Sequence, residues 1–263
     1  MAPLSLCTWN VNSVRSRLDH VLTYLSEKEP DVMCLQETKV EDKLFPRVPF
    51  MELGYHVEVY GGKTHAGVAT LSKTPPSAVQ RGFRSGDEEE RRRILYTQIG
   101  EVAIYNLYVP NGTNLESEHF PYKLHWFRRL RAEIDAHHKK GSPLVICGDF
   151  NIAPTAADVY SVAVMTGKLH FTDAEHQALR DFLGDDLRDC YRKHHPDPGA
   201  PEKAGFTWFD YRGLSWRKRE GLRIDHVYAS PPMYERNLSC ENDIEPRKWE
   251  QPSDHLPVTA RFA

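Results

Sequence analysis

Short apolar runs that end in polar residues recur along this chain. The runs at residues 4–9, 32–35 and 144–147 have the length and composition of buried β-strands. Polar side chains follow them directly: Asn10, Glu37, and the pair Asp149 and Asn151. Because a buried strand fixes the backbone at its end, residues just beyond several such ends can face one crevice. The pattern therefore predicts a sheet-based protein with a polar site at its strand ends.

The rest of the pattern predicts an α/β chain. Further strands are expected at residues 55–60, 67–71, 93–99, 102–108 and 222–228, and after His255. The strand at 102–108 is a fourth one with a polar end, and Asp225 is unusual because it lies in the middle of the strand expected at 222–228. Apolar residues at helical spacing predict helices over 14–25, with Ser13 as cap, over 120–138, and over much of 154–193.

Two segments have the composition of exposed connections. The charged run at 87–93 is expected at the solvated end of a hairpin, in preference to a binding patch. The proline-rich segment at 195–201 is expected to be a loop. We do not expect this loop to separate domains, because the motifs on its two sides must meet. Residues 1–263 are therefore predicted to form a single domain.

Composition narrows the class of protein. A chain of 263 residues with 40% hydrophobic content can bury a large core. A mean hydropathy of −0.58 and the lack of a long apolar run argue against a membrane span. The first residues enter strand-like sequence without a basic and apolar leader, so a cytoplasmic, reducing location is expected. The five cysteines include no close pair and are expected to be buried free thiols.

Charge gives no general attraction to nucleic acid. The net charge is −3 and the isoelectric point is about 6.5. A polyanionic substrate would therefore have to meet a local basic face of the protein.

The Gly-Asp-Phe-Asn segment at 148–151 carries the clearest chemical signal. The carboxylate of Asp149 can accept a proton from water, and the amide of Asn151 can hold that water or a phosphate oxygen. Taken alone, the segment is equally compatible with an Asx-type turn that closes a strand.

A set of motifs spread over nearly the whole chain resembles the exonuclease III family of abasic-site endonucleases, within the wider DNase I-like superfamily. The motifs are Trp-Asn at 9–10, Leu-Gln-Glu-Thr-Lys at 35–39, Tyr-Val-Pro-Asn at 108–111, Gly-Asp-Phe-Asn at 148–151, Trp-Phe-Asp-Tyr-Arg at 208–212, Gly-Leu-Arg-Ile-Asp at 221–225 and Pro-Ser-Asp-His at 252–255. The second, fifth and sixth are the narrowest and resemble the bacterial branch. The resemblance implies a four-layer α/β sandwich, with two mixed β-sheets packed face to face and flanked by helices.

The resemblance also implies a function. A family member would cleave DNA 5′ to abasic sites with Mg²⁺, for which Mn²⁺ can substitute, and would act as a 3′–5′ exonuclease and 3′-phosphatase. Its partner would be double-stranded DNA with abasic sites or blocked 3′ ends, bound by a monomer. Cleavage of a phosphodiester needs a metal ion, an activated water and donors to the phosphate, which matches the polar set found here.

The resemblance assigns expected roles to single residues. Glu37 would be the principal metal ligand, with Asn10 and Asp254 near the ion directly or through water. Asp149 would activate the attacking water, and Asn151 would position it. His255, oriented by Asp225, would donate to the scissile phosphate. Tyr108 would be a further donor, as a phenol of lowered pKa, and Asn111 a further phosphate contact.

Asn12 departs from the mammalian relatives, which carry an aspartate there, so a second tightly held ion is in doubt.

Substrate choice is expected to depend on apolar residues. A sugar without its base can be swung out of the duplex into a pocket that an intact base would overfill. Trp208, Leu222 and Ile224 match the family positions that line such a pocket, although ordinary core packing would also explain them. Arg212 and the basic segment at 216–219 are candidates for a wedge or a clamp on the DNA backbone.

Two other functions remain open at this stage. One is a superfamily relative that hydrolyses another phosphoester, such as an inositol phosphate, a phospholipid headgroup or intact DNA. The other is a non-catalytic DNA-binding scaffold that keeps only the fold. The complete polar set argues against the scaffold.

Overall fold

Two six-stranded β-sheets form the centre of the molecule in the computed structural model, which describes residues 1–62, 66–86, 92–196 and 205–263. In the first sheet β1 is parallel to β2, and the other neighbours are antiparallel. Its strands, in spatial order, are β11 (Asn237–Asn242), β12 (Val258–Phe262), β1 (Leu4–Asn10), β2 (Val32–Gln36), β4 (Gly67–Ser72) and β3 (His56–Gly61).

The second sheet has the same mixed character. Here β7 is parallel to β8, and the other neighbours are antiparallel. Its strands, in spatial order, are β5 (Ala78–Arg81), β6 (Ile94–Ile99), β7 (Val102–Tyr108), β8 (Leu144–Asp149), β10 (Asp225–Ala229) and β9 (Arg188–Asp189).

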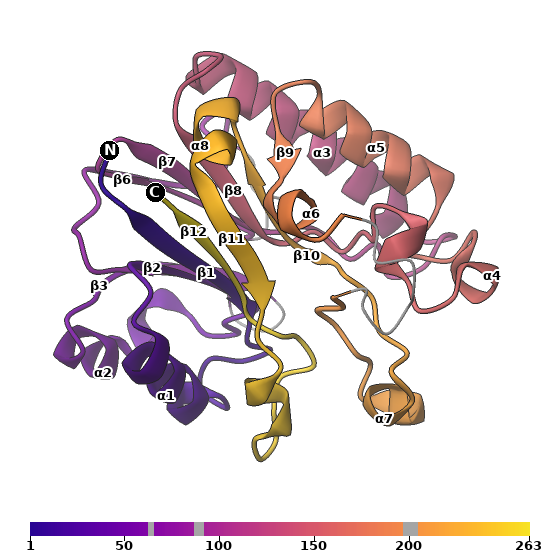
Figure 1. Ribbon diagram of the computed structural model, residues 1–263, viewed down its shortest axis with the longest axis horizontal. Coiled ribbons are helices and arrows are strands. Elements are labelled where there is room, and N and C mark those ends of the chain that lie inside the picture. The colour runs from indigo at the N-terminus through magenta and orange to yellow at the C-terminus, as the bar shows by residue number, and fades with distance from the viewer. Residues whose placement is uncertain (63–65, 87–91, 197–204) are drawn as a thin grey trace.

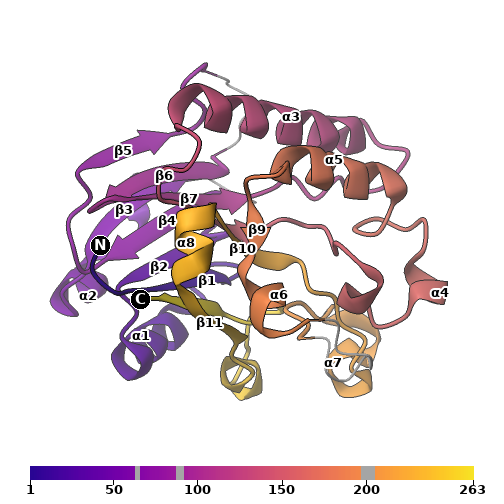
Figure 2. The same ribbon diagram turned by 45° about the horizontal axis from the view of Figure 1, so that its top comes forward.

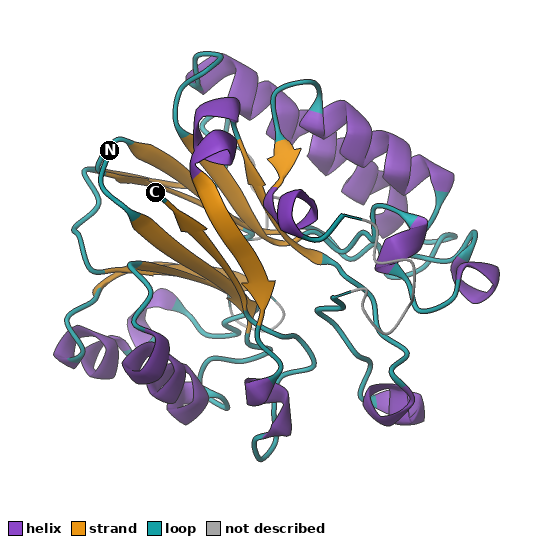
Figure 3. Cartoon of the chain, in the orientation of Figure 1, coloured by secondary structure: helices purple, strands orange, loops and turns teal. Residues whose placement is uncertain are grey.

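Helices cover the outer faces of both sheets (Figures 1 and 3). Figure 1 shows α1 and α2 on the side of the first sheet, and Figure 2 shows α3 and α5 side by side on the second. The α-helices are α1 (Leu18–Lys28), α2 (Arg47–Glu52), α3 (His119–His137), α4 (Val162–Met165), α5 (Asp173–Leu183), α6 (Cys190–His194), α7 (Ser215–Lys218) and α8 (Pro231–Arg236).

Three layers of apolar side chains separate these four layers of structure. Alternation along each strand sends successive side chains to opposite faces. In β8, Val145 and Cys147 pack between the two sheets, whereas Leu144 and Ile146 pack against α3 and α5. A third cluster, which includes Trp9 and Val21, lies between the first sheet and α1 and α2. The predicted four-layer sandwich of two mixed sheets is confirmed.

The first helix begins later than its apolar spacing predicts. It starts at Leu18, and Ser13 is not its cap but adopts a φ of +98°. The preceding backbone instead pairs with the segment after β2, since Val11 N donates to Gln36 O at 3.1 Å and Ser13 N donates to Glu37 O at 2.8 Å. This tertiary pairing satisfies amide groups that a helix would otherwise use.

Other element boundaries also differ from the prediction. Strand β10 begins at Asp225, so this residue lies at a strand end and not in the middle of a strand. Residues 154–194 contain three α-helices of 4 to 11 residues, a short 3-10 helix (Ala156–Asp158) and the short strand β9. Residues 87–91 of the expected hairpin end and 197–201 of the expected loop lie outside the described residues.

All five cysteines are buried and free, as predicted. Among the helices of the described ranges, none has the length and apolar character that crossing a membrane requires.

Candidate active site

Strand pairing brings the predicted polar residues to one end of the sandwich. In the first sheet Asn10 is the register partner of Gln36, which precedes Glu37. In the second sheet Asp149 is paired with Tyr108 on one side and with Asp225 on the other. Residues far apart in the chain therefore share one edge because of their register.

Asn10 connects the two sheets at this edge. Its Nδ2 donates to Glu37 Oε1 at 2.9 Å and to Asp149 Oδ2 at 2.9 Å. The side-chain amide thus holds two carboxylates close to each other, which would repel one another without a donor or a cation between them.

Asp149 is a buried carboxyl whose surroundings favour proton uptake. Burial raises its pKa to about 7; the positive charge of His255 opposes this shift, and the carboxylates of Asp225 and Glu37 add to it. The backbone N–H of Asn151 donates to Asp149 Oδ1 at 2.9 Å. A carboxylate with a pKa near neutrality is well matched to act as a general base.

His255 lies between two carboxylates. Its Nδ1 is 2.9 Å and 3.1 Å from the two oxygens of Asp225, and its Nε2 is 3.9 Å from Asp149 Oδ2. Burial disfavours the charged ring, but Asp225 outweighs burial and raises the pKa of His255 to about 10. The ring is therefore an imidazolium at neutral pH, and its Nε2–H is available to a substrate oxygen.

The carboxylates of Glu37 and Asp149 can hold a divalent cation. Glu37, Asp149 and His255 each offer an atom within 4.8 Å of the others. The protonated His255 has no free lone pair, so the donors are the two carboxylates, with the Asn10 amide beside them. Sparse oxygen donors of this type suit Mg²⁺ and leave positions for water and phosphate. Lys39 Nζ lies 2.9 Å from Glu37 Oε2 and limits the negative charge of this group.

Asp254 does not belong to the group formed by Glu37, Asp149 and His255. Its Oδ1 accepts from Asn12 Nδ2 at 2.9 Å, and its Oδ2 accepts from Trp208 Nε1 at 3.0 Å. If Asp254 lies near the ion as predicted, its carboxylate also accepts hydrogen bonds from Asn12 and Trp208. Asn12 also accepts from Lys39 Nζ.

Tyr108 lies at the site, but the prediction that the pKa of its phenol is lowered is wrong. Burial raises the pKa of the phenol well above its usual value, and the nearby Glu37 carboxylate adds to the shift. The guanidinium of Arg93, 4.4 Å from the ring centre, opposes it without reversing it. In the protein alone Tyr108 is therefore a neutral hydrogen-bond donor.

The amides of Asn111 and Asn151 are paired. Asn111 Nδ2 donates to Asn151 Oδ1 at 3.0 Å, and Asn151 Nδ2 donates to Val109 O at 3.0 Å. Each Nδ2 keeps one further hydrogen, so both side chains can still donate to a phosphate oxygen.

Trp208 presents surface beside the cluster, whereas Leu222 and Ile224 do not. Trp208 is half-buried, and its ring centre is 6.5 Å from that of His255. Leu222 and Ile224 are each 2% exposed and belong to an apolar cluster against which Trp208 packs. Arg212 is on an exposed loop, where its guanidinium is paired with Asp210 at 3.0 Å.

Lys39 and His170 lie at the site and were missed by reasoning from the sequence, whereas Asn12 was noted only as a departure from the mammalian relatives. Lys39 and Asn12 contact Glu37 and Asp254 respectively, and His170 has its ring centre 6.2 Å from Trp208. Only Lys39 and Asn12 could have been found from the sequence, since both lie in the polar segments after β1 and β2. Asn12, Glu37, Lys39 and Asn151 also have positive φ angles of 46° to 53°, a conformation that is rare outside glycine and that clusters at functional sites.

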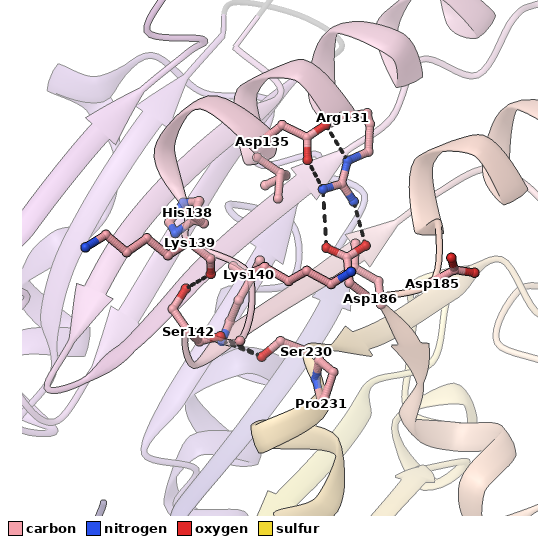
Figure 4. Close-up of a pocket in the computed structure, with 14 residues that line it drawn as sticks. Arg131, Asp135, His138, Lys139, Lys140, Ser142, Asp185, Asp186, Ser230 and Pro231 are labelled. Carbon is pink, nitrogen blue, oxygen red and sulfur yellow. Dashed lines mark hydrogen bonds and ion pairs between the residues drawn. The ribbon is translucent and has the colours of Figure 1, made fainter.

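A second pocket lies at the opposite end of β8 (Figure 4). Its most prominent cation, Arg131, is already paired with Asp135 and Asp186. Ser230 Oγ likewise donates to Ser142 O at 2.8 Å. Because these polar groups satisfy one another, the pocket offers no comparable catalytic set.

Comparison with known proteins agrees with this geometry. The model of the Endonuclease/Exonuclease/phosphatase family matches residues 7–255. The chain is 35% identical to "Exodeoxyribonuclease III" of Haemophilus influenzae, over 98% of this chain and 100% of that protein.

Among solved structures, a Neisseria protein described as the 3′ phosphatase NExo bound to product DNA hairpin superposes with a TM-score of 0.93 at 37% identity, covering 99% of both chains. An AP endonuclease from Archaeoglobus fulgidus superposes with a TM-score of 0.92 at 38% identity, covering 98% of this chain and 99% of the other. The protein is therefore a hydrolase of the nuclease type, and it belongs to the endonuclease/exonuclease/phosphatase family.

Proposed function

We propose that the protein is a Mg²⁺-dependent DNA repair nuclease that cleaves 5′ to abasic sites and also processes 3′ ends as an exonuclease and phosphatase. The observation that carries the proposal is Asp149, buried at the junction of the two sheets between Asn10 and the cationic His255. The names of the similar proteins cover the same three activities. We further propose that residues 1–263 act as one domain and as a monomer on double-stranded DNA.

The chain's own residues divide the reaction between them. Asp149 takes a proton from the attacking water, which the amide of Asn151 holds in line with the phosphorus. As the new P–O bond forms, the bond from phosphorus to the 3′ oxygen breaks, and that oxygen takes a proton from solvent water and leaves as a 3′-hydroxyl. The Nε2–H of His255 donates to a non-bridging phosphate oxygen, and Asp225 keeps that ring charged and oriented. Tyr108 and Asn111 donate to the same phosphate. Bound between Glu37 and Asp149 and near Asn10, Mg²⁺ would neutralise the charge that develops on the phosphate oxygens.

A substrate panel tests the proposal directly. Purified protein with Mg²⁺ is given a duplex with one abasic site, a duplex with a 3′-phosphate, an intact blunt duplex and an inositol phosphate. We expect incision at the abasic site and release of phosphate from the 3′ end. Turnover of the inositol phosphate alone would contradict the DNA assignment, and absence of all cleavage with Mg²⁺ or Mn²⁺ would support the non-catalytic scaffold.

Glu37→Ala should raise the concentration of Mg²⁺ that cleavage requires. The change removes one carboxylate from the oxygen donors, so the ion should be held at least about 10- to 100-fold more weakly, the loss that follows from removing even a group that only orients a ligand. Initial rates over a Mg²⁺ titration measure this, and EDTA should abolish cleavage by both proteins. Glu41→Ala, a substitution outside the site, is the control. A titration curve equal to that of the unaltered protein would argue against Glu37 as a ligand.

Trp208→Ala should reduce abasic-site incision more than release of a 3′-phosphate. The ring is the part of the apolar cluster that remains accessible, and burying an apolar side chain of this kind, here against the sugar, contributes about 1.5–3 kcal/mol. We therefore expect about a tenfold or larger loss on the abasic duplex, measured as kcat/KM on both substrates. Equal losses on both, together with a lower Tm, would indicate a folding defect instead of a substrate contact.

A further inference from the structure

A fully buried lysine lies directly behind the paired amides of the site. Lys123 is on α3 and is 0% exposed. Its Nζ donates to Asn151 O at 2.7 Å, to Asn111 O at 3.2 Å and to Glu175 Oε1 at 2.5 Å. The three hydrogens of the ammonium group are thus each assigned to an acceptor.

The two carbonyl groups belong to the residues whose side chains face the substrate. Asn111 and Asn151 come from the loops after β7 and β8, and their amides bond to each other at 3.0 Å. Asn151 is in the left-handed region, with φ of +53°, a conformation that asparagine adopts more readily than most residues other than glycine. A single cation therefore joins the two loops from the side opposite the substrate.

Glu175 holds this cation in place. Besides Lys123, its carboxylate accepts from His170 N at 3.1 Å and from Thr172 N and Oγ1 at 3.1 Å and 2.8 Å, at the start of α5. Burial lowers the pKa of Lys123, and the carboxylate of Glu175 counters that effect only in part. A buried ion pair is rarely needed for stability, since apolar side chains of similar size can replace it at no loss. Its presence beside two substrate-facing residues calls for a different role.

We propose that Lys123 is a positioning residue for catalysis, which sets the geometry of the Asn111–Asn151 pair through their backbone carbonyl groups. The proposal rests on the function proposed above, and it adds a residue that itself touches neither substrate nor metal.

The experiment compares two variants that differ only at Lys123. Glu175→Gln can keep the bonds from Thr172 but loses the carboxylate oxygen that accepts from Lys123 and His170 N. Without that counter-charge the pKa of Lys123 should fall further, and a neutral amine still has two hydrogens for the two carbonyl groups. Lys123→Met combined with Glu175→Gln removes the lysine's bonds to both carbonyl groups without leaving a buried charge unpaired, and His170 Nδ1 stays 2.6 Å from Asn151 O. Because a displacement of about 1 Å can reduce a rate about 100-fold, we expect kcat of the double variant to fall by that order relative to Glu175→Gln, with KM changed less than about threefold. Lys140→Met, on the exposed surface far from the site, is the control.

Combining Asn151→Ala with the replacement of Lys123 distinguishes a positioning role of Lys123 from a general loss of protein stability. Asn151→Ala should reduce kcat strongly in the unaltered protein but only slightly when Lys123 has already been replaced, because both changes remove the same interaction. Additive losses, or a double variant that is as active as Glu175→Gln, would overturn the proposal.

A readout independent of activity keeps the two proposals distinguishable. Amide hydrogen exchange at Asn151 and Thr113, which bond to Asp149 and Asn111, should be faster in the double variant than in Glu175→Gln. Unchanged exchange would contradict the role of Lys123. An unaltered protein that cleaves no DNA would contradict the proposed function and leave this exchange comparison valid.

Discussion

Asp149→Asn is expected to lower the rate of abasic-site incision by about 10²–10⁴-fold or more, while the variant still binds abasic DNA. The asparagine amide has nearly the same shape, but its single oxygen can replace only one of the two carboxylate oxygens, which accept separately from Asn10 Nδ2 and from the Asn151 backbone N–H. What it cannot do is take a proton from the attacking water. It also removes one of the two carboxylates that would hold the metal, so the loss should exceed that for a general base alone.

The measurement needs rates and binding on the same duplex. Single-turnover incision gives the chemical step, and Kd comes from fluorescence anisotropy in Ca²⁺, which supports binding without fast cleavage. Asp185→Asn, an exposed change at the other end of the sandwich, is the matched control. A variant that cleaves at the unaltered rate would remove Asp149 from the mechanism, and loss of both binding and Tm would indicate a structural role.

His255→Gln should have the second-largest effect, a fall in kcat of about 10²–10³-fold, the range for loss of one donor to a developing charge. Glutamine can still donate a hydrogen bond but carries no positive charge. The charge of His255 depends on Asp225, which raises the pKa of the ring to about 10 against the effect of burial.

Asp225→Asn tests this dependence. Without this carboxylate the pKa of the ring should fall, because burial opposes the charge and only Asp149 and Asp254 still favour it, so Asp225→Asn should also lose activity. Combining it with His255→Gln should then add little, because both changes remove the same cation. Full additivity of the two losses in kcat would show that Asp225 acts separately from His255.

The candidate site shows how far a local pattern reaches. Asn10, Glu37, Tyr108 and Asp149 could each be located at a strand end, because hydrophobic runs and the polar residues after them are read directly along the chain. The family motifs implied the four-layer sandwich, which the fold confirms. Asp225 was assigned to the middle of a strand, because the apolar residues before it look like a continuation of β10, whereas Leu222 and Ile224 pack in a separate apolar cluster.

Residues that act through tertiary contacts were harder to predict. Lys123 reads as one of many polar positions on an amphipathic helix, and nothing in its spacing indicates that its ammonium group is buried. The start of α1 was misplaced for the same reason, since residues 11–14 bond to a segment that is distant in sequence.

The sequence by itself determined that the chain is α/β, most of its strands and the set of residue types that phosphodiester hydrolysis needs, because periodicity and strand ends are local properties. Strands β5, β9 and β11 do not follow from that pattern. The tertiary structure alone decided how these groups act on one another. It set the distances among Asn10, Glu37 and Asp149, the cationic state of His255 and the neutral state of Tyr108. Desolvation and charge–charge interaction depend on what surrounds a group in space, and a linear sequence does not contain that information.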